Sequence, residues 1–407
     1  MITKKNKRHL IGLSFIICHL SFSVALTSCY NADHEFPDYE GGTTAYFAYQ
    51  NPVRTLILGN DIYDNTLDKE HKCRIWSTMG GAYGGRNATV DIVVDESLCD
   101  NLYFTDEGGN PAEPVRPMPS NYYTLSSNVI PYNGDQRGYV EVQFTDAFFN
   151  DVKSVENTYV IPLVMMNPNG FDHILTGTPR EGLTPTRTNT EDWEILAKDY
   201  VLYCVKYMNP WQGKYIRRGV DNVTENGVTN VFVRKDFKLV NTDVERYKEN
   251  PVNQNDEVCG IITKNMSQAI FPVSINIGKD EAGDTRPSQL CNLILTFNGD
   301  KCTISSDDEE VPSDGAGEFI IKGTEKQEYK DYQWGSLNGE PVQRDILRLA
   351  YNVSFKKGRV IGTKTVNGKE VPWVLENDVQ VSTNDTLVVQ TRESNKKEFF
   401  KTKYVKN

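Results

Sequence analysis

Short runs of β-branched and aromatic residues recur along this chain, and several of them alternate between apolar and polar positions. Residues 139–144 (YVEVQF) alternate without a break, and residues 89–94 (TVDIVV) and 158–164 (TYVIPLV) have the length and composition of strands. A period of two places every second side chain on the same face of a sheet. Turn-forming segments such as residues 131–135 (PYNGD) separate the runs. We therefore expect a β-sandwich over residues 44–175.

The second half of the chain, residues 209–407, also shows only strand-like periods. Asn298-Gly299 and Asn367-Gly368 lie between such runs, and both residue types tolerate positive φ, which favours type I′ hairpins. Consecutive hairpins without an intervening helix predict an antiparallel barrel or meander, lipocalin-like in type, so the whole fold is expected to be all-β. The predicted strands of this half are residues 214–220, 230–234, 270–277, 292–297, 303–306, 319–322, 347–355 and 387–391.

Residues 176–208 are predicted to link the two halves. Glycine, proline and threonine are frequent in residues 177–190, which is typical of a connecting segment. Residues 192–199 suit a short helix, and residues 200–207 suit a strand that joins the halves.

The start of the chain has the pattern of an export signal. A basic beginning is followed by an apolar run over residues 10–26 that contains no carboxylate, so residues 1–28 are predicted to be a signal peptide. Leu26-Thr27-Ser28-Cys29 matches the lipobox, the motif before which signal peptidase II cuts. We expect acyl chains on Cys29, and several chains hold a protein on a membrane almost permanently. The predicted membrane contact is this lipid alone.

Residues 29–43 form an acidic tether in this interpretation. Asp33, Glu35, Asp38 and Glu40 follow the cysteine closely, which resembles the surface-export signal of Bacteroidota lipoproteins; a plain solvated linker is the alternative. The chain has 44 Lys and Arg against 55 Asp and Glu, and four of the basic residues lie in the predicted signal peptide. So acidic a protein, without a basic cluster, repels phosphate backbones, and nucleic acid is an unexpected partner.

Motifs for chemistry are missing from the sequence. The glycine-rich residues 80–86 lack the ending of a phosphate-binding loop, and the histidines have no metal-type spacing. The acidic residues 307–310 lack the frame of a calcium loop. We expect no catalytic residue, no metal and no cofactor, and hence a protein that is not an enzyme. The sequence leaves open whether six cysteines pair or pack as free thiols: Cys73, Cys99, Cys204, Cys259, Cys291 and Cys302.

Aromatic residues in or beside turn material are the candidate binding residues. Sugars present flat C–H faces that stack on aromatic rings, and their hydroxyl groups need amide or carboxylate partners. Aromatic residues of this kind include Trp76, Tyr83, Tyr122, Tyr123 and Tyr215, although an aromatic residue in a β-protein is more often part of the core. Residues 209–213 (NPWQG) also suit a structural plug at the start of the second domain. The residues proposed for glycan contact are Trp211, Tyr332, Trp334 and Trp373.

Several segments together resemble a known family. Residues 46–50 (YFAYQ), 52–55, 60–65 (NDIYDN), 119–125 (PSNYYTL) and 157–163 resemble the N-terminal immunoglobulin-like domain of outer-membrane lipoproteins from Bacteroidota polysaccharide-utilisation loci. Residues 204–218, Trp334-Gly335 and residues 344–347 resemble the domain of unknown function that often follows it. The resemblance covers nearly the whole chain after the signal peptide, and its motifs carry no known chemistry.

The resemblance implies a glycan-binding lipoprotein of the outer membrane that faces the cell exterior. Its partners would be an oligosaccharide or polysaccharide, a TonB-dependent transporter and the lid lipoprotein of that transporter. Related N-terminal domains also precede glycosidase modules, and no such module follows here, which favours binding over hydrolysis. Two alternatives remain: an accessory lipoprotein that docks to the transporter complex, and a glycoside hydrolase whose carboxylates converge only in the fold.

Overall fold

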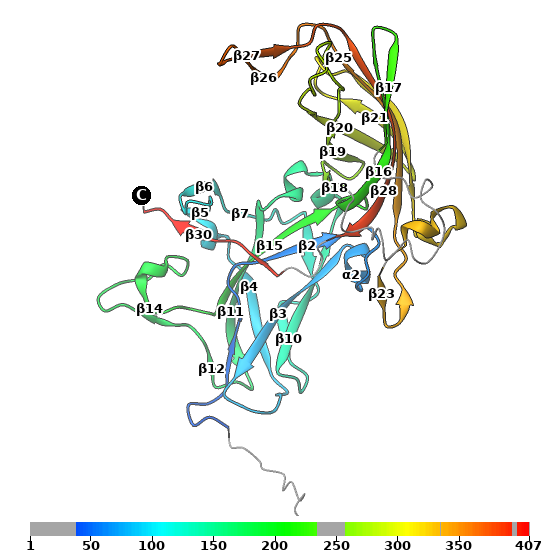
Figure 1. The fold of residues 1–407 in the computed structure, drawn as a ribbon. Helices are drawn as coiled ribbons and strands as arrows, with labels where there is room; N and C mark the ends of the chain where they lie inside the picture. Colours follow the sequence, from blue (N-terminus) through cyan, green and yellow to red (C-terminus); the bar gives the residue numbers. More distant parts are fainter. Residues whose placement is uncertain (1–37, 234–256, 334, 393–396, 407) are drawn as a thin grey trace, which may run out of the picture.

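The computed structural model describes residues 38–233, 257–333, 335–392 and 397–406, and its architecture is all-β. Figure 1 shows a β-sandwich with curled sheets beside a closed antiparallel barrel, as the strand patterns predict. The signal peptide, Cys29, the first part of the tether and Trp334 lie outside the described residues. In the described ranges, no helix is long and apolar enough to span a membrane.

The first domain consists of two sheets that face each other across a shared core. Apolar residues from both sheets, among them Ile75, Val140, Leu56 and Leu163, meet in this core and are almost fully buried. The first sheet has the order β12 (His173–Ile174), β1 (Thr44–Tyr46), β3 (Lys72–Gly80), β10 (Arg137–Phe144) and β8 (Tyr123–Leu125). The second has the order β29 (Glu398–Phe399), β2 (Pro52–Ile57), β15 (Tyr200–Met208), β11 (Tyr159–Asn169), β4 (Thr89–Val94) and β9 (Val129–Pro131), with β7 (Arg116–Pro117) paired to β11.

The central strands of the second sheet, β11 and β15, are buried on both faces, which explains their continuous apolar runs. Its outer face carries a further cluster that includes Val160, Leu202, Phe104 and Phe400. Short elements cover this face or connect the strands: α2 (Thr66–Lys69), α3 (Asp146–Asn150), β5 (Leu102–Thr105), β6 (Pro111–Pro114), β13 (Thr178–Pro179), β14 (Trp193–Ile195), β30 (Thr402–Tyr404) and the 3₁₀ turns η2 (Glu96–Cys99), η3 (Val152–Val155) and η4 (Thr190–Asp192).

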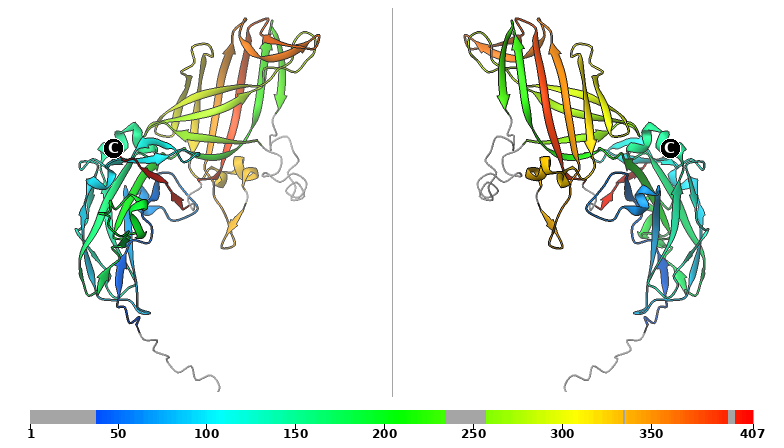
Figure 2. Two further views of the ribbon diagram at one scale, coloured as in Figure 1. Left: turned by 90° about the vertical axis from the view of Figure 1, so that its left-hand side faces the viewer. Right: turned by 90° about the vertical axis from the view of Figure 1, so that its right-hand side faces the viewer.

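The second domain is an eight-stranded barrel that closes by the pairing of its first and last strands. β16 (Gly213–Glu225) pairs with β28 (Val379–Thr391) along its whole length. Between them the ring runs through β18 (Glu257–Thr263), β19 (Gln268–Ile275), β20 (Gln289–Asn298), β21 (Lys301–Ser306), β22 (Ser313–Ile320) and β25 (Ile346–Phe355). Figure 2 shows the barrel at one end and the sandwich at the other end of an elongated, bent molecule.

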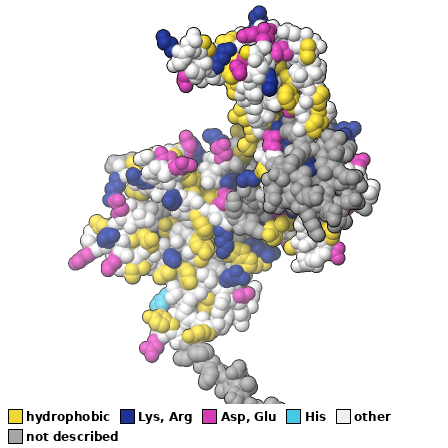
Figure 3. Space-filling view, in the orientation of Figure 1, with side chains coloured by type: hydrophobic (Ala, Val, Ile, Leu, Met, Phe, Trp, Pro, Cys, Tyr) yellow, Lys and Arg dark blue, Asp and Glu magenta, His cyan; other side chains and the backbone are white. Residues whose placement is uncertain are grey.

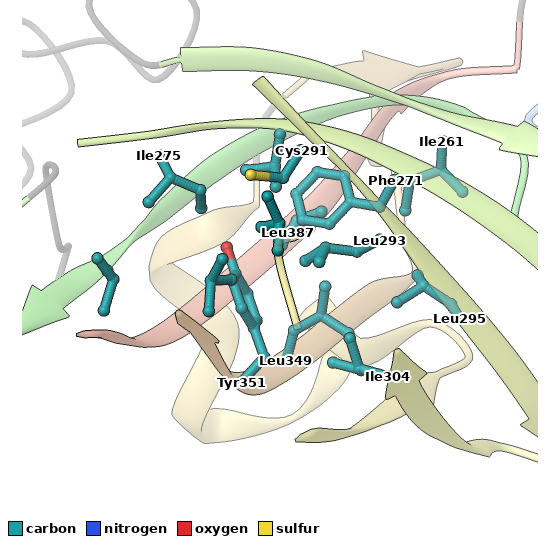
Figure 4. Packing of buried hydrophobic residues seen from close by; sticks show 14 of the residues in the cluster. Ile261, Phe271, Ile275, Cys291, Leu293, Leu295, Ile304, Leu349, Tyr351 and Leu387 are labelled. Atoms are coloured by element: carbon teal, nitrogen blue, oxygen red, sulfur yellow. The ribbon is translucent and has the colours of Figure 1, made fainter. Parts of the chain in front are cut away.

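Apolar side chains from every second position fill most of the barrel. Phe271, Leu293, Leu349 and Leu387 come from four different strands and meet in its interior (Figure 4). Outside the ring, β17 (Val228–Val233) pairs with the second half of β16, and the hairpin of β26 (Val360–Val366) and β27 (Lys369–Val374) projects from one end of the barrel (Figure 1). The opposite end carries η6 (Gly323–Glu325), η7 (Gln327–Tyr332) and the small hairpin of β23 (Ser336–Leu337) and β24 (Glu340–Pro341).

The predicted linker is only partly a linker. Residues 200–208 form β15, which lies between β2 and β11 in the second sheet, so the first domain extends well past residue 175. The helix predicted for residues 192–199 is wrong: Trp193–Ile195 is strand β14, because it pairs with β13 and its tryptophan packs into the outer cluster.

The end of the chain returns to the first domain, whereas the prediction assigns all of residues 209–407 to the second domain. β29 pairs with β2 and β30 pairs with β5. Phe400, between them, is buried in the outer cluster. The chain thus enters the barrel from β15 and comes back through β29.

One predicted hairpin turn is confirmed and the other is displaced by one residue. Asn367 and Gly368 both have positive φ between the paired residues Val366 and Lys369, as a type I′ turn requires. In the β20–β21 hairpin, Asn298 pairs with Lys301, so the turn is Gly299-Asp300 and of these two only Gly299 has positive φ.

Candidate functional site

The outward face of β3 and β10 carries a row of aromatic and charged side chains. Inward residues of β3 are buried at every second position, which leaves Arg74, Trp76 and Thr78 facing outward. In the antiparallel register, Trp76 lies directly opposite Tyr139, and Arg74 lies opposite Glu141. The ring centroids of Trp76 and Tyr139 are 4.7 Å apart. Side chains that lie opposite each other on paired strands at this spacing make stabilising contacts. The register of β3 against β10 therefore places these side chains in one row.

Two arginines hold the aromatic pair in place. The guanidinium carbon of Arg74 lies 4.4 Å from the centre of the Tyr139 ring, and that of Arg137 lies 5.2 Å from the centre of the Trp76 ring. Arg74 Nε is also 3.5 Å from a carboxylate oxygen of Glu141. Such contacts orient the rings while Trp76 and Tyr139 remain 44% and 37% exposed.

Trp76 opens onto a groove of about 370 Å³, which lies within the range of small-ligand sites. Its lining is mostly apolar and aromatic, with Arg137, Lys397 and Glu398 as the charged members. Tyr49 and Phe399 form another wall, with ring centroids 4.9 Å apart, and both are about half exposed. Three exposed aromatic rings therefore border one concave surface.

The returning end of the chain completes this groove. β29 pairs antiparallel with β2, with Pro52 opposite Phe399 and Val53 opposite Glu398. Lys206 Nζ of β15 lies 2.8 Å from a carboxylate oxygen of Glu398 and fixes that side chain. Phe399 can thus stand beside Tyr49, although 350 residues separate them in the sequence.

A partly buried tyrosine also lines the groove. Tyr203 of β15 lines the groove, and burial raises the pKa of its hydroxyl group well above the ordinary value. The group therefore stays protonated and donates a hydrogen bond to the carbonyl oxygen of Arg74, 3.2 Å away. This bond joins the second sheet to β3, so the strand that carries Trp76 is held from behind.

The structure does not bring the predicted glycan-contacting residues together. Trp211 is buried in the barrel core and stacks on Phe297, with centroids 3.7 Å apart and planes at 5°. Asn209 Oδ1 accepts hydrogen bonds from the amides of Trp211 and Gln212, and Tyr215 donates its hydroxyl hydrogen to the Trp211 carbonyl. These contacts agree with the alternative interpretation of residues 209–213 as a structural plug at the start of the second domain. The ring has no free face for a sugar.

The other two predicted residues that the structure describes, Tyr332 and Trp373, lie on different parts of the barrel. Tyr332 of η7 is buried against Ile216, Ile320 and Val388 on the outer side of the strands. Trp373 is half-buried on the projecting β26–β27 hairpin, where Lys364 Nζ lies 5.4 Å from the centre of its ring.

The aromatic groove therefore lies in the first domain rather than in the barrel. Trp76 is one of the aromatic residues that the sequence analysis names as candidate binding residues beside turns. Tyr139 is predicted only as part of a strand, and Phe399 lies outside every predicted strand. The position of Tyr139 could have been found from its place in an alternating strand, since it is an aromatic residue at an outward position. The approach of Phe399 depends on the fold and has no local sequence mark.

All six cysteines of the described residues are free thiols. Burial raises the pKa of the Cys73, Cys204 and Cys302 thiols to about 12, so they stay protonated and pack as small apolar groups. Among the described residues, no group of three or more His, Cys, Asp and Glu side chains is placed to hold a metal ion. Figure 3, which views the molecule from the same side as Figure 1, shows acidic and basic side chains interspersed over the described part of the surface.

Family models match both domains. A model of a domain of unknown function (DUF5627) matches residues 210–393, and a model of an N-terminal domain matches residues 39–172. No curated protein matches the chain.

Solved structures of similar proteins come from Bacteroides ovatus. One, a protein of unknown function, is 37% identical, covers 91% of this chain and 100% of its own, and superposes with a TM-score of 0.69. Another protein of unknown function (13% identical, 88% and 99% covered) has a TM-score of 0.37. A multidomain protein including DUF1735 (11% identical, 88% and 99% covered) has a TM-score of 0.36. The last two scores are too low to support an inference. The chain therefore belongs to the family of the first of these Bacteroides ovatus proteins and combines its N-terminal domain with a DUF5627 domain.

Proposed function

We propose that this protein binds an oligosaccharide or polysaccharide non-covalently in the aromatic groove of the first domain. The observation that supports this most is the arrangement of Trp76, Tyr49 and Phe399, three exposed rings around one concave surface. Rings that are held by neighbouring side chains can stack on sugar faces without losing much conformational freedom. Arg137, Lys397 and Glu398 line the same groove and can form hydrogen bonds with sugar hydroxyl groups.

The proposal includes a place for the protein in the cell. Lipid on Cys29 would hold it on the outer membrane, and the acidic tether would direct it to the cell exterior. A TonB-dependent transporter and its lid lipoprotein would then receive the captured glycan. Cys29→Ser should abolish labelling by a radioactive fatty acid and release the protein from membranes; labelling that persists in this variant would contradict the lipid anchor.

Affinity electrophoresis of residues 30–407 through gels that contain different polysaccharides tests the binding activity. Retardation by one glycan class, without release of reducing sugar, supports a binding protein and excludes hydrolysis. If no polysaccharide retards the folded protein, the accessory role at the transporter becomes the better hypothesis.

Two tryptophans provide a matched pair of variants for locating the site. Trp76 and Trp373 are both partly exposed, the first in the groove and the second on the projecting hairpin. Trp76→Ala should weaken binding of the retarding glycan by about 1–3 kcal/mol, the usual cost of losing a central aromatic contact, and Trp373→Ala should leave it unchanged. The reverse pattern would place the sugar site on the barrel and contradict the groove.

A further inference from the structure

A large cavity lies where the two domains meet, apart from the aromatic groove. Its volume is about 710 Å³, enough for a ligand of several sugar rings. The first domain contributes the loop from Asn60 to Tyr63 and Lys69 of α2, and the barrel contributes Lys322, residues 343–345 and the end of β28. We call this cavity the junction cleft.

The junction cleft is basic in a protein that is acidic as a whole. Four basic side chains, Lys69, Lys322, Arg344 and Arg392, line it together with two carboxylates, whereas the whole chain has a formal charge of −11. Asp345, one of the two carboxylates, is already used: Arg392 Nη2 lies 3.2 Å from one of its oxygens, and the amide of Lys322 donates to the other at 2.8 Å. Lys69 and Lys322 are exposed residues of the lining, and Lys69 Nζ donates a hydrogen bond to Asn60 Oδ1 at 3.0 Å.

The floor of the cleft is held rigidly. Arg392 is buried and donates hydrogen bonds to the carbonyl oxygens of Asn60 and Gln212 in addition to its contact with Asp345. Lys322 has a φ of 48°, a left-handed conformation that lysine rarely adopts, and the bond from its amide to Asp345 holds it there. Such strain is common where a side chain is positioned for a ligand.

Arg344 brings a partly buried positive charge to the same wall. Its Nη1 donates to the carbonyl oxygens of Val389 and Gln390, at 3.0 and 2.7 Å. Burial lowers the pKa of Arg344 to about 10, which means that its charge is poorly solvated.

The wall from the first domain offers contacts for a sugar. Asp61 Oδ1 accepts hydrogen bonds from the amides of Ile62 and Tyr63, at 2.6 and 3.4 Å, and the Ile62 and Tyr63 side chains of this turn are exposed. Asp61 Oδ2 is buried and has no hydrogen-bond donor among the described residues. The amides of Asn60, Gln343 and Gln390 lie around the same cavity.

We propose that the junction cleft binds a carbohydrate that carries acidic groups, with Lys69, Lys322 and Arg344 facing its carboxylate or sulfate groups and Tyr63 packing on a ring. A plain anion site would need neither the size of the cleft nor its apolar wall. This inference does not depend on the aromatic groove, because the residues of the two sites do not overlap.

The test is affinity electrophoresis of residues 30–407 through polygalacturonate, alginate and chondroitin sulfate, each compared with a neutral galactan. Retardation by an acidic polysaccharide and not by the galactan is expected. Lys322→Gln and Lys69→Gln should each weaken it roughly fivefold, the upper end of the usual effect of one solvent-exposed ion pair. Lys369→Gln, which changes an exposed lysine at the tip of the β26–β27 hairpin, is the control and should have no effect.

The remaining outcomes separate this proposal from the aromatic groove. Trp76→Ala should leave retardation by the acidic polysaccharide unchanged; if it abolishes retardation while the two lysine variants bind normally, the groove is the site and the cleft proposal is wrong. Equal competition by inorganic sulfate at the same molar concentration of charged groups would also overturn it, because the cleft would then recognise only the anion. Absence of retardation by all three acidic polysaccharides would overturn it as well.

Discussion

Arg217 Nε lies 2.8 Å from Asp385 Oδ2 inside the barrel, and neither side chain is exposed to solvent. Tyr351 donates its hydroxyl hydrogen to the same carboxylate oxygen, and Arg217 also reaches the carboxylate of Glu257. Burial opposes the charge of Arg217, but these acidic partners outweigh it and raise its pKa above the ordinary value. The two strands that close the barrel, β16 and β28, are thus joined by an ion pair as well as by their backbones.

Breaking this ion pair on one side should be costly. Arg217→Met leaves Asp385 buried without its cation, and we expect a loss of about 3–5 kcal/mol in the free energy of unfolding. The double variant Arg217→Met with Asp385→Leu should recover most of that loss, since it removes both charges. Urea denaturation of the three proteins measures this, and a double variant as unstable as the single one would contradict the explanation.

Trp211→Ala should destabilise the barrel by about 3–5 kcal/mol, because the ring is buried and stacks on Phe297. Trp211→Phe keeps an aromatic ring in the core and should cost less. Thermal unfolding of both variants gives the comparison. A Trp211→Ala protein with unchanged stability would show that the ring does not act as a plug.

The pair of Glu225 and Arg286 should make stability depend on pH. Both nitrogens of the guanidinium end bond to the Glu225 carboxylate, at 2.8 and 2.9 Å, and these bonds lower the pKa of Glu225 below its ordinary value of 4.5. A lowered carboxyl pKa stabilises the fold above the unfolded-state pKa, and this contribution is lost as the pH falls through the folded-state value.

Glu225→Gln should therefore be about 1.5–3 kcal/mol less stable than the parent at pH 7, the usual range for a hydrogen bond to a charged group. The difference should shrink as the pH falls below 4.5. Glu370→Gln, at an exposed position of the hairpin, is the control and should change stability little at either pH. A difference between Glu225→Gln and the parent that stays constant down to acidic pH would exclude this pair as the cause.

Removing the last strands should loosen the first domain. Ending the chain after residue 397 deletes β29 and β30 and uncovers the pocket of Phe400, whose ring lies 5.0 Å from that of Phe104. We expect a loss of about 3 kcal/mol or more and faster amide exchange in β2 and β5, whose partners are gone. A chain that ends after Tyr404 keeps both strands and should behave like the parent.

Local patterns predict the strands but not their partners. Residues 89–94 and 139–144 are strands because alternation and β-branched composition decide local structure there. The sequence pattern of residues 200–207 also indicates a strand, yet its place between β2 and β11 depends on contacts that no local pattern encodes. For the same reason the predicted domain boundaries differ from the observed ones.

The candidate site was harder to predict, because an aromatic ring can bind a ligand only if the fold leaves it exposed. Trp211 and Trp76 look alike in the sequence, since both lie beside turn residues. The first packs into the barrel core, whereas the second is kept at the surface by its outward position on β3. The ring that faces Trp76 is Tyr139, and only the register of β3 against β10 places it there.

The return of the chain through β29 makes the barrel an insertion within the first domain. β15 runs parallel to β2 and β29 runs antiparallel to it, so the chain leaves and re-enters the sheet at the same end. The two strands flank β2, two strand spacings apart, and Met208 pairs with Ile57 whereas Glu398 pairs with Val53, so about 16 Å separates the end of β15 from the start of β29. A loop of a few residues is enough to cover that distance. The sandwich is therefore a complete host domain, and the barrel inserted in it could be replaced by another domain. A chain in which a short loop joins Met208 to Lys397 should fold as the sandwich alone.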